Sequence, residues 1–275
     1  MSADRRSLFS NGRVAHDGLR GQVEAGRFTA GVLRRVSAPL APIRPAPQGA
    51  ALDRQTLYGH PVRQLDPQEG FARDETSGYV GYISEGDLGE WAAPTHRIAA
   101  RSSFLFNAPD FKTPDPLHLS CGSLLQIAEV EGKYARTHDG QYAIAAHLAP
   151  CDRAQPDMAA TAETLLGTPY LWAGNSAFGI DCSGLVQLAA QAAQLPCQGD
   201  SDLQSQSFGQ AVPLGTAPRR NDLLFWKGHV AIVSGEDEII HANAHHMAVA
   251  REGLKEAIAR IERQGDGRIT AHRRA

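Results

Sequence analysis

Gly179-Ile180-Asp181-Cys182-Ser183-Gly184 stands directly before an amphipathic segment of the chain. In that segment the apolar residues recur at helical spacing, as Leu185, Val186, Leu188, Ala189, Ala192 and Leu195. Cys182 therefore falls in the first turn of a predicted helix. A thiol there faces unpaired backbone N–H groups and the positive end of the helix dipole, and both favour thiolate over thiol. The stretch predicts a nucleophile, and a small buried cysteine at a helix start is the alternative.

Two histidines downstream complete a candidate triad. His229 and His241 lie on two predicted strands that are joined by turn residues at 234–237. Each is six residues from Gly235, so a turn centred there makes them direct cross-strand partners on one sheet face, with Cβ atoms roughly 5 Å apart. Taken singly, each is more simply an ordinary strand histidine. Together they allow Cys182 to attack, His229 to take its proton and His241 to fix the tautomer of His229.

Several spaced motifs together resemble the NlpC/P60 cysteine peptidases. In chain order they are Gly167–Gly174, Asp181–Gly184, Gly228–Ile232 and Ile240–Ala242. The resemblance covers roughly residues 155–260. It implies an α+β papain-like domain that hydrolyses peptidoglycan stem peptides, usually between D-glutamate and a diamino acid such as diaminopimelate.

Two positions are compared with the family pattern. Ala173 stands where many members have a second glycine, which is a small departure. The third catalytic position is occupied by His241, and histidine is one of the accepted choices there.

An internal repeat precedes the region of resemblance. Residues 69–73 recur at 131–136, and residues 78–80 recur at 140–143. In each case matching residues, Arg73 with Arg136 and Tyr79 with Tyr142, lie 63 positions apart. Such an offset, with short strands and polar turns, predicts two small all-β barrels, each of which resembles a bacterial SH3-like domain. The proline-rich residues 41–47 are expected in the long early loop of the first barrel.

We therefore expect four parts in the chain. They are an N-terminal segment at 1–34, SH3-like domains at 35–90 and 95–150, and the catalytic domain at 155–275. The length of 275 residues suits two domains or three small ones, and a hydrophobic content of 42% is sufficient for real cores. A net charge of −3 without a basic block argues against a nucleic-acid or membrane-surface role.

The compartment is inferred from the amino terminus and the cysteines. No apolar stretch of signal-peptide length follows residues 1–6, and no run approaches a membrane span, so we expect a cytoplasmic protein. Cys121, Cys151 and Cys197 show no CxxC or metal-ligand spacing, so we expect free thiols.

Two SH3-like barrels ahead of this peptidase resemble the recycling branch of the family, which cleaves small muropeptides inside the cell. The resemblance implies that the first barrel closes one end of the groove, so that only peptides with a free amino-terminal L-alanine fit. The implied substrate is L-Ala-γ-D-Glu-diaminopimelate, cut after D-glutamate to release L-Ala-D-Glu. The alternatives are an amidase or acyltransferase on the same scaffold, a lytic endopeptidase on intact peptidoglycan, a non-enzymatic wall-binding module and a metal-binding protein.

Three residues beside the predicted nucleophile are candidates for substrate binding. Tyr170 lies twelve residues before Cys182 and is expected to bind substrate or support the oxyanion hole, with a core tyrosine as the alternative. The resemblance implies that Asp181 and Ser183 contact the substrate's backbone. Asp181 also fits the N-cap of the predicted helix, a role that contributes about 1 kcal/mol.

Four more candidates lie farther away. In the recycling branch an acidic residue and a serine reach the substrate eighteen residues after the cysteine, which corresponds to Asp200 and Ser201, and helix capping is their alternative. In the first barrel Asp53 and Tyr79 are candidates for holding the substrate's ammonium, by charge and by hydroxyl.

A metal site is not expected. His245 and His246 lie close in sequence to His241, but no carboxylate or cysteine stands at supporting spacing. The predicted cysteine mechanism also requires no metal or organic cofactor.

Overall fold

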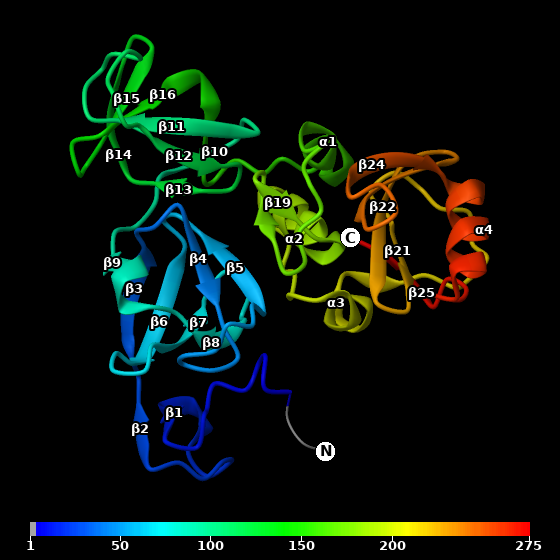
Figure 1. Cartoon of the computed structure of the whole chain (residues 1–275), viewed down its shortest axis with the longest axis horizontal. Coiled ribbons are helices and arrows are strands. Elements are labelled where there is room, and N and C mark those ends of the chain that lie inside the picture. Colours follow the sequence, from blue (N-terminus) through cyan, green and yellow to red (C-terminus); the bar gives the residue numbers. More distant parts are fainter. Residues whose placement is uncertain (1–3) are drawn as a thin grey trace. The chain divides into compact units, whose positions relative to one another are not determined.

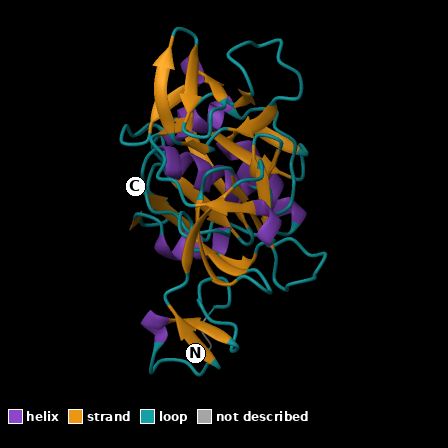
Figure 2. Ribbon diagram, turned by 90° about the vertical axis from the view of Figure 1, so that its left-hand side faces the viewer, coloured by secondary structure: helices purple, strands orange, loops and turns teal. Residues whose placement is uncertain are grey.

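The computed structural model describes residues 4–275. The chain forms two compact units, one ending at Asp152 and the other running from Arg153 to Ala275 (Figure 1). The first unit consists of strands with short 3-10 turns, and the second combines strands with helices. Figure 2 shows the strands in orange and the helices in purple. Within residues 4–275 no helix is long and apolar enough to cross a membrane.

The N-terminal segment packs onto the first barrel. It contains a parallel strand pair, β1 (Val14–His16) and β2 (Arg27–Thr29), with a 3-10 turn at Asp17–Leu19. An apolar cluster joins the segment to barrel strands and consists of Phe9, Val14, Leu65, Phe71 and Val80. Residues 1–3 of the predicted 1–34 segment lie outside the described residues.

The first barrel combines a five-stranded sheet with a hairpin. The sheet has the order β8-β7-β6-β3-β9 and the hairpin pairs β4 with β5. Their bounds are β3 (Val32–Val36), β4 (Leu40–Ile43), β5 (Arg54–Leu57), β6 (Pro61–Asp66), β7 (Phe71–Asp74), β8 (Val80–Tyr82) and β9 (Leu88–Glu90). A 3-10 turn at Glu85–Asp87 precedes β9.

The prediction that the proline-rich residues 41–47 form a loop is wrong for their first half. Pro42 lies in β4 opposite Gln55, and the loop begins only after Ile43. A proline is tolerated there because β4 has a neighbour on one side only, so its missing N–H breaks no central ladder.

The second barrel repeats the hairpins of the first. Its two sheets have the orders β12-β11-β16-β15-β14 and β13-β10-β17. The repeated glycines Gly70 and Gly132 have φ of 78° and 58° in the turns before β7 and β15, where a left-handed backbone is needed. The bounds are β10 (His96–Ile98), β11 (Ser102–Phe106), β12 (Leu117–Ser120), β13 (Leu124–Leu125), β14 (Ile127–Glu131), β15 (Tyr134–Thr137), β16 (Tyr142–Ile144) and β17 (Leu148–Pro150), with a 3-10 turn at Ala145–His147.

The second unit is built around a six-stranded antiparallel sheet of order β20-β25-β21-β22-β23-β24. Its helices are α1 (Met158–Thr164), α2 (Cys182–Ala192), α3 (Ser201–Ser207) and α4 (Leu254–Gln264). Its strands are β18 (Asn175–Ser176), β19 (Gly179–Ile180), β20 (Gln210–Ala211), β21 (Leu223–Trp226), β22 (His229–Gly235), β23 (Glu238–Asn243), β24 (Ala248–Gly253) and β25 (Ala271–Arg274).

The core of this unit positions the predicted site. Helices α1 and α2 pack against β22 and β23. Apolar residues of α4 pack with Ala231, Val233 and Ile239 of the same strands. An α+β unit preceded by small β-barrels is the fold class that the sequence predicts, and the prediction is confirmed.

Candidate active site

Helix α2 begins at Cys182, as predicted, and Asp181 fixes that start. Oδ1 of Asp181 accepts hydrogen bonds from the backbone N–H of Gly184 at 2.7 Å and from the hydroxyl of Ser183 at 3.0 Å. Its Oδ2 accepts from the backbone N–H of Ala173 at 3.0 Å. The predicted N-cap is confirmed, and the carboxylate also ties α2 to the preceding loop.

The loop before α2 approaches the helix so closely that side chains are restricted there. A Cβ atom on Gly184 would collide with the carbonyl oxygen of Gly174. Ala173 has φ of 62°, in the left-handed region that favours glycine. The structure thus gives a physical reason why glycine suits position 173.

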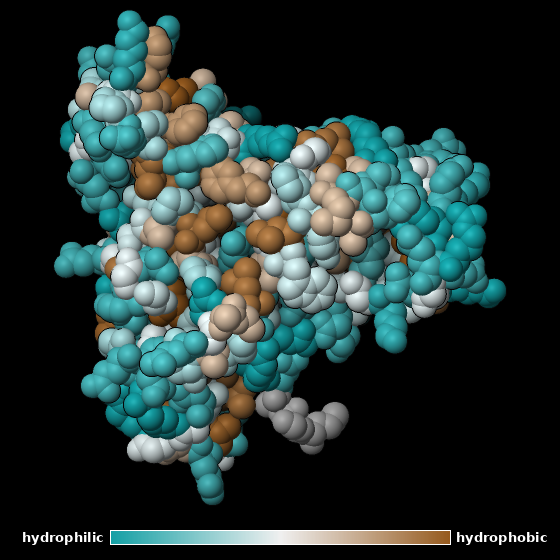
Figure 3. All heavy atoms as spheres, in the orientation of Figure 1, coloured by the Kyte–Doolittle hydropathy of each residue, from teal (hydrophilic) through white to brown (hydrophobic). Residues whose placement is uncertain are grey.

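The burial of Cys182 contrasts with the exposure of the loop that precedes it in the chain. Cys182 is buried, with 8% of its surface exposed, whereas residues of the loop before α2 expose large apolar side chains. Trp172 is 73% exposed, and Leu171 and Phe178 are also exposed. On the face that Figure 3 draws, hydrophobic residues, in brown, lie among hydrophilic ones, in teal.

His229 and His241 are in direct contact. Nε2 of His229 lies 2.9 Å from Nδ1 of His241, within hydrogen-bond distance. The predicted register is wrong, however, because Ile232 pairs with Ile240 and an irregularity follows between Val233 and Gly235. The turn is therefore not centred on Gly235, and the two histidines are diagonal neighbours that are offset by two residues.

His241 has a second partner that the sequence analysis missed. Its Nε2 lies 3.0 Å from Oε2 of Glu252, on the neighbouring strand β24. Arg260 of α4 donates to both oxygens of this carboxylate, from Nε at 2.8 Å and from a terminal nitrogen at 2.7 Å. No local motif marks Glu252 or Arg260, because their contacts depend on the β23–β24 register and on how α4 packs.

The environment keeps both imidazoles neutral near pH 7. Burial, together with the charges of His241 and Arg260, lowers the pKa of His229 to about 3. Burial lowers the pKa of His241 to about 4, although the charge of Glu252 opposes this shift. A neutral imidazole can accept a proton, as a general base must.

The helix that carries Cys182 lies against the strands that carry the histidines. Helix α2 contacts both β22, which begins at His229, and β23, which contains His241. The fold therefore brings together the elements on which the sequence predicts a nucleophile, a base and an orienting group.

Three other predicted residues flank α2. Half-buried Tyr170 forms a β-bridge with Ile180, two residues before Cys182. Ser201 starts α3, and the side chain of Asp200 at its N-cap position does not hydrogen-bond to the first turn. The side chain of Gln204 in α3 donates to the backbone carbonyl of Ser183 at 2.9 Å, which anchors α3 to the start of α2.

In the first unit, the candidate ammonium-binding residue Asp53 is paired with a cation of the chain itself. Arg5 donates to both carboxylate oxygens of Asp53, at 2.6 and 2.9 Å. The hydrogen bond to Asp53 raises the pKa of Arg5, and the charges of Asp53 and Tyr79 raise it further. Tyr79 itself is 3% exposed and belongs to the core of the first barrel. Asp53 therefore already holds a positive charge from the chain itself.

In the folded chain a carboxylate, that of Glu252, lies close to His241 and His246. Ligand atoms of His241, His246 and Glu252 all lie within 4.8 Å of one another. The carboxylate is already bound by the guanidinium of Arg260, whose charge disfavours a metal cation there. His245 stacks edge-on against His246, with ring centroids 4.8 Å apart.

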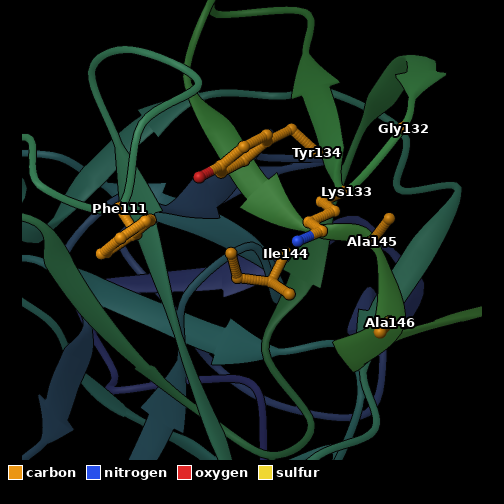
Figure 4. Close-up of a pocket in the computed structure, with 7 residues that line it drawn as sticks. All are labelled: Phe111, Gly132, Lys133, Tyr134, Ile144, Ala145 and Ala146. Carbon is orange, nitrogen blue, oxygen red and sulfur yellow. The ribbon is translucent and has the colours of Figure 1, made fainter.

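The second barrel carries an apolar pocket of about 440 Å³ that contains none of the predicted site residues. The rings of Phe111 and Tyr134 line it together with Ile144 and Lys133, and Phe111 lies on the opposite side from Lys133 (Figure 4). Phe111 is 69% exposed.

Cys121, Cys151 and Cys197 are free thiols, as predicted. Burial raises the pKa of Cys121 to about 11, and burial also raises the pKa of Cys151. Neither group is disposed to form a thiolate at neutral pH.

Comparisons with known proteins agree with this geometry. Residues 167–261 match the NlpC/P60 family, and residues 43–88 match the bacterial dipeptidyl-peptidase SH3 domain. The crystal structure of an NlpC/P60 family protein from Bacillus cereus ATCC 10987 superposes with a TM-score of 0.73 and 20% identity, covering 88% of this chain and 99% of that one. At this identity the superposition shows the shared fold.

Two curated relatives align with more than half of the chain. Dipeptidyl-peptidase 6 of Lysinibacillus sphaericus is 27% identical over 221 residues, which cover 70% of this chain and 81% of the relative. The gamma-D-glutamyl-L-lysine dipeptidyl-peptidase of Bacillus subtilis (strain 168) is 28% identical over 192 residues, which cover 62% of each chain.

Proposed function

The chain is a cysteine peptidase with an NlpC/P60 domain, and we propose that it hydrolyses the γ-D-glutamyl–diamino acid bond of peptidoglycan stem peptides. The observation that carries the proposal is the 2.9 Å contact between His229 and His241 on strands that pack against the Cys182 helix. Two relatives named as dipeptidyl-peptidases and the matched SH3 domain support this substrate class.

In the proposed mechanism Cys182 is the nucleophile. Its thiolate attacks the carbonyl carbon of the γ-D-glutamyl bond, and the oxyanion is held by the backbone N–H of Cys182 with the Tyr170 hydroxyl. His229, oriented by His241, takes the thiol proton and gives it to the leaving amine. Water then hydrolyses the thioester with His229 as base, which regenerates the thiol.

Substrate recognition is assigned to the residues around α2 and to the first barrel. Asp181 and Ser183 contact the peptide backbone, and Asp200 with Ser201 reaches the substrate from the start of α3. The hydrogen bond from Gln204 to the carbonyl of Ser183 supports this assignment, because it holds α3 beside α2.

The proposed substrate is a free peptide, L-Ala-γ-D-Glu-diaminopimelate, or its lysine counterpart. Cleavage after D-glutamate releases L-Ala-D-Glu for recycling of cell-wall peptides in the cytoplasm. In this proposal Asp53 binds the substrate's ammonium in competition with Arg5, which donates to both of its carboxylate oxygens. The four free cysteines are compatible with a reducing compartment.

The test compares four substrates with one enzyme preparation. These are the diaminopimelate and lysine tripeptides, the N-acetyl form of the better one, and intact peptidoglycan. A charge-assisted hydrogen bond contributes about 1.5 to 3 kcal/mol, so acetylation is expected to lower kcat/KM at least about tenfold. Equal efficiency on free peptide, acetylated peptide and intact peptidoglycan would contradict the recycling role, and cleavage of the polymer alone would favour the wall-lytic alternative.

A further inference from the structure

Four side chains form one continuous hydrogen-bonded series behind the predicted base. It runs from His229 to His241 at 2.9 Å, from His241 to Glu252 at 3.0 Å, and from Glu252 to Arg260 at 2.7 and 2.8 Å. The last three side chains of the series are well buried. That of His241 is inaccessible to solvent, and those of Glu252 and Arg260 are 12% and 13% exposed. We propose that Glu252 is a positioning residue that selects the tautomer of His229, with Arg260 holding its carboxylate in place. This inference rests on the proposed function, in which His229 is the base.

The series has a direction because one end is fixed. Arg260 always carries its charge and can only donate hydrogen bonds. Burial raises the pKa of Glu252, but hydrogen bonds and charge from Arg260 outweigh burial and hold it below its usual value. Glu252 is therefore an ionised carboxylate, which can only accept.

The fixed end determines where each proton lies. Because Glu252 accepts only, Nε2 of His241 must carry the hydrogen that it donates. Neutral His241 then has a lone pair on Nδ1, so Nε2 of His229 must donate to it. His229 is left with a lone pair on Nδ1, and that atom is the one available to take the proton of Cys182.

Loss of Glu252 removes this constraint. His241 can then carry its hydrogen on Nδ1 and donate to Nε2 of His229, which places the hydrogen of His229 on Nδ1. In that tautomer Nδ1 of His229 cannot accept a proton. The other groups that face the pair electrostatically are Arg260, Asp266 and His246, and none of them accepts the hydrogen bond that Glu252 accepts.

The direct test is tautomer assignment by nitrogen NMR of the histidine-labelled full chain. Wild type is expected to show the Nε2–H form at both His229 and His241. In Glu252→Leu a substantial Nδ1–H population should appear at His229, with kcat on the tripeptide falling at least about tenfold and KM changing little. In Glu252→Gln the side-chain oxygen can still accept the hydrogen bond from His241. This variant should therefore keep part of the Nε2–H population of His229 and part of kcat.

Two further variants separate positioning from stability. Glu252→Leu combined with Arg260→Met leaves no unpaired charge, and it should show the same tautomer change in a folded chain. Glu238→Gln removes the cross-strand ion pair with Arg251 at 2.6 Å from the same hairpin, and it should change neither tautomers nor kcat.

The proposal is overturned if both leucine-containing variants keep His229 and His241 in the Nε2–H form. It is also overturned if their kcat stays within about twofold of wild type. The NMR measurement needs no substrate, so a wild-type enzyme that fails to cleave the tripeptide contradicts the proposed function without affecting this assignment.

Discussion

His229 and His241 share a 2.9 Å hydrogen bond although they are not opposite each other in the β22–β23 ladder. The hairpin is closed by Gly235 with Glu238, so its centre lies beyond Gly235, and the resulting diagonal geometry brings ring nitrogens rather than ring faces together. Their ring planes are inclined by 56°. This geometry lets one imidazole orient the other without stacking, which is what a base and its orienting group require.

Cys182 should be alkylated faster than the other thiols at neutral pH. It alone combines a helix start with histidine-bearing strands, whereas burial raises the pKa of Cys121 to about 11 and also raises that of Cys151. Partial labelling with iodoacetamide followed by peptide mass spectrometry gives the ranking. Labelling of Cys121 or Cys151 ahead of Cys182 in the native chain would contradict an activated nucleophile.

The second unit should lose stability as the pH falls below about 6.5. The pKa of folded His229 is about 3 and that of His241 about 4, so between those values and 6.5 the unfolded chain binds protons that the folded chain does not. Stability is complete above this window and falls by at most about 1.4 kcal/mol per pH unit for each histidine.

The pH effect is measured by urea unfolding at pH 7.5 and at two lower values. Trp226, whose ring centroid lies 5.8 Å from that of His229, makes fluorescence a suitable probe. His229→Gln should flatten the pH dependence by removing one titrating group. An identical pH slope in wild type and His229→Gln would show that this imidazole is not held neutral by the fold.

Asp181→Ala should destabilise the chain by about 2 to 3 kcal/mol, because it removes the N-cap and two further hydrogen bonds. Asp181→Asn keeps an acceptor for Gly184 and should lose less. Asp157→Ala, which removes the cap of α1 and a partly exposed ion pair with Arg220, is the control, with an expected loss of about 1 to 2 kcal/mol. Chemical unfolding of the three variants measures the loss of unfolding free energy. Equal losses for Asp157→Ala and Asp181→Ala would contradict the role of Asp181 in tying α2 to the preceding loop.

Arg5→Ala should lower KM for the free-amino tripeptide, by about threefold, without changing kcat. Arg5 holds both oxygens of Asp53, so it competes with the substrate ammonium that the proposal assigns to this carboxylate. The N-acetyl peptide should not respond. Arg20→Ala, which breaks the pair with Asp17 in the same segment, is the control. An unchanged KM for the free amine would argue that Asp53 serves only to hold Arg5.

The sequence predicts those features that local patterns determine. The start of α2 follows from helical spacing after an Asp that can cap, and the repeated hairpins follow from Gly70 and Gly132 at turn positions. The contact of two histidines follows from two strands around a polar turn. These signals lie within a few residues of the structure that they describe.

Features set by long-range packing are not visible in the same way. The turn is closed by Gly235 with Glu238, so it is centred beyond Gly235, and its position displaces the pairing that symmetry about Gly235 predicts. Glu252 and Arg260 reach His241 only because β24 pairs with β23 and α4 returns over the sheet. Pro42 in β4 is a similar case, since only the absence of a second neighbour makes a strand proline acceptable there.

The most direct test of the central claim is release of L-Ala-D-Glu from L-Ala-γ-D-Glu-diaminopimelate, followed by liquid chromatography and mass spectrometry for wild type and Cys182→Ala. We predict release by wild type and none above background by the variant. The variant should keep the wild-type unfolding midpoint, because the start of α2 is held by Asp181 and not by the thiol. Turnover by a folded, contaminant-free Cys182→Ala protein would contradict the cysteine mechanism.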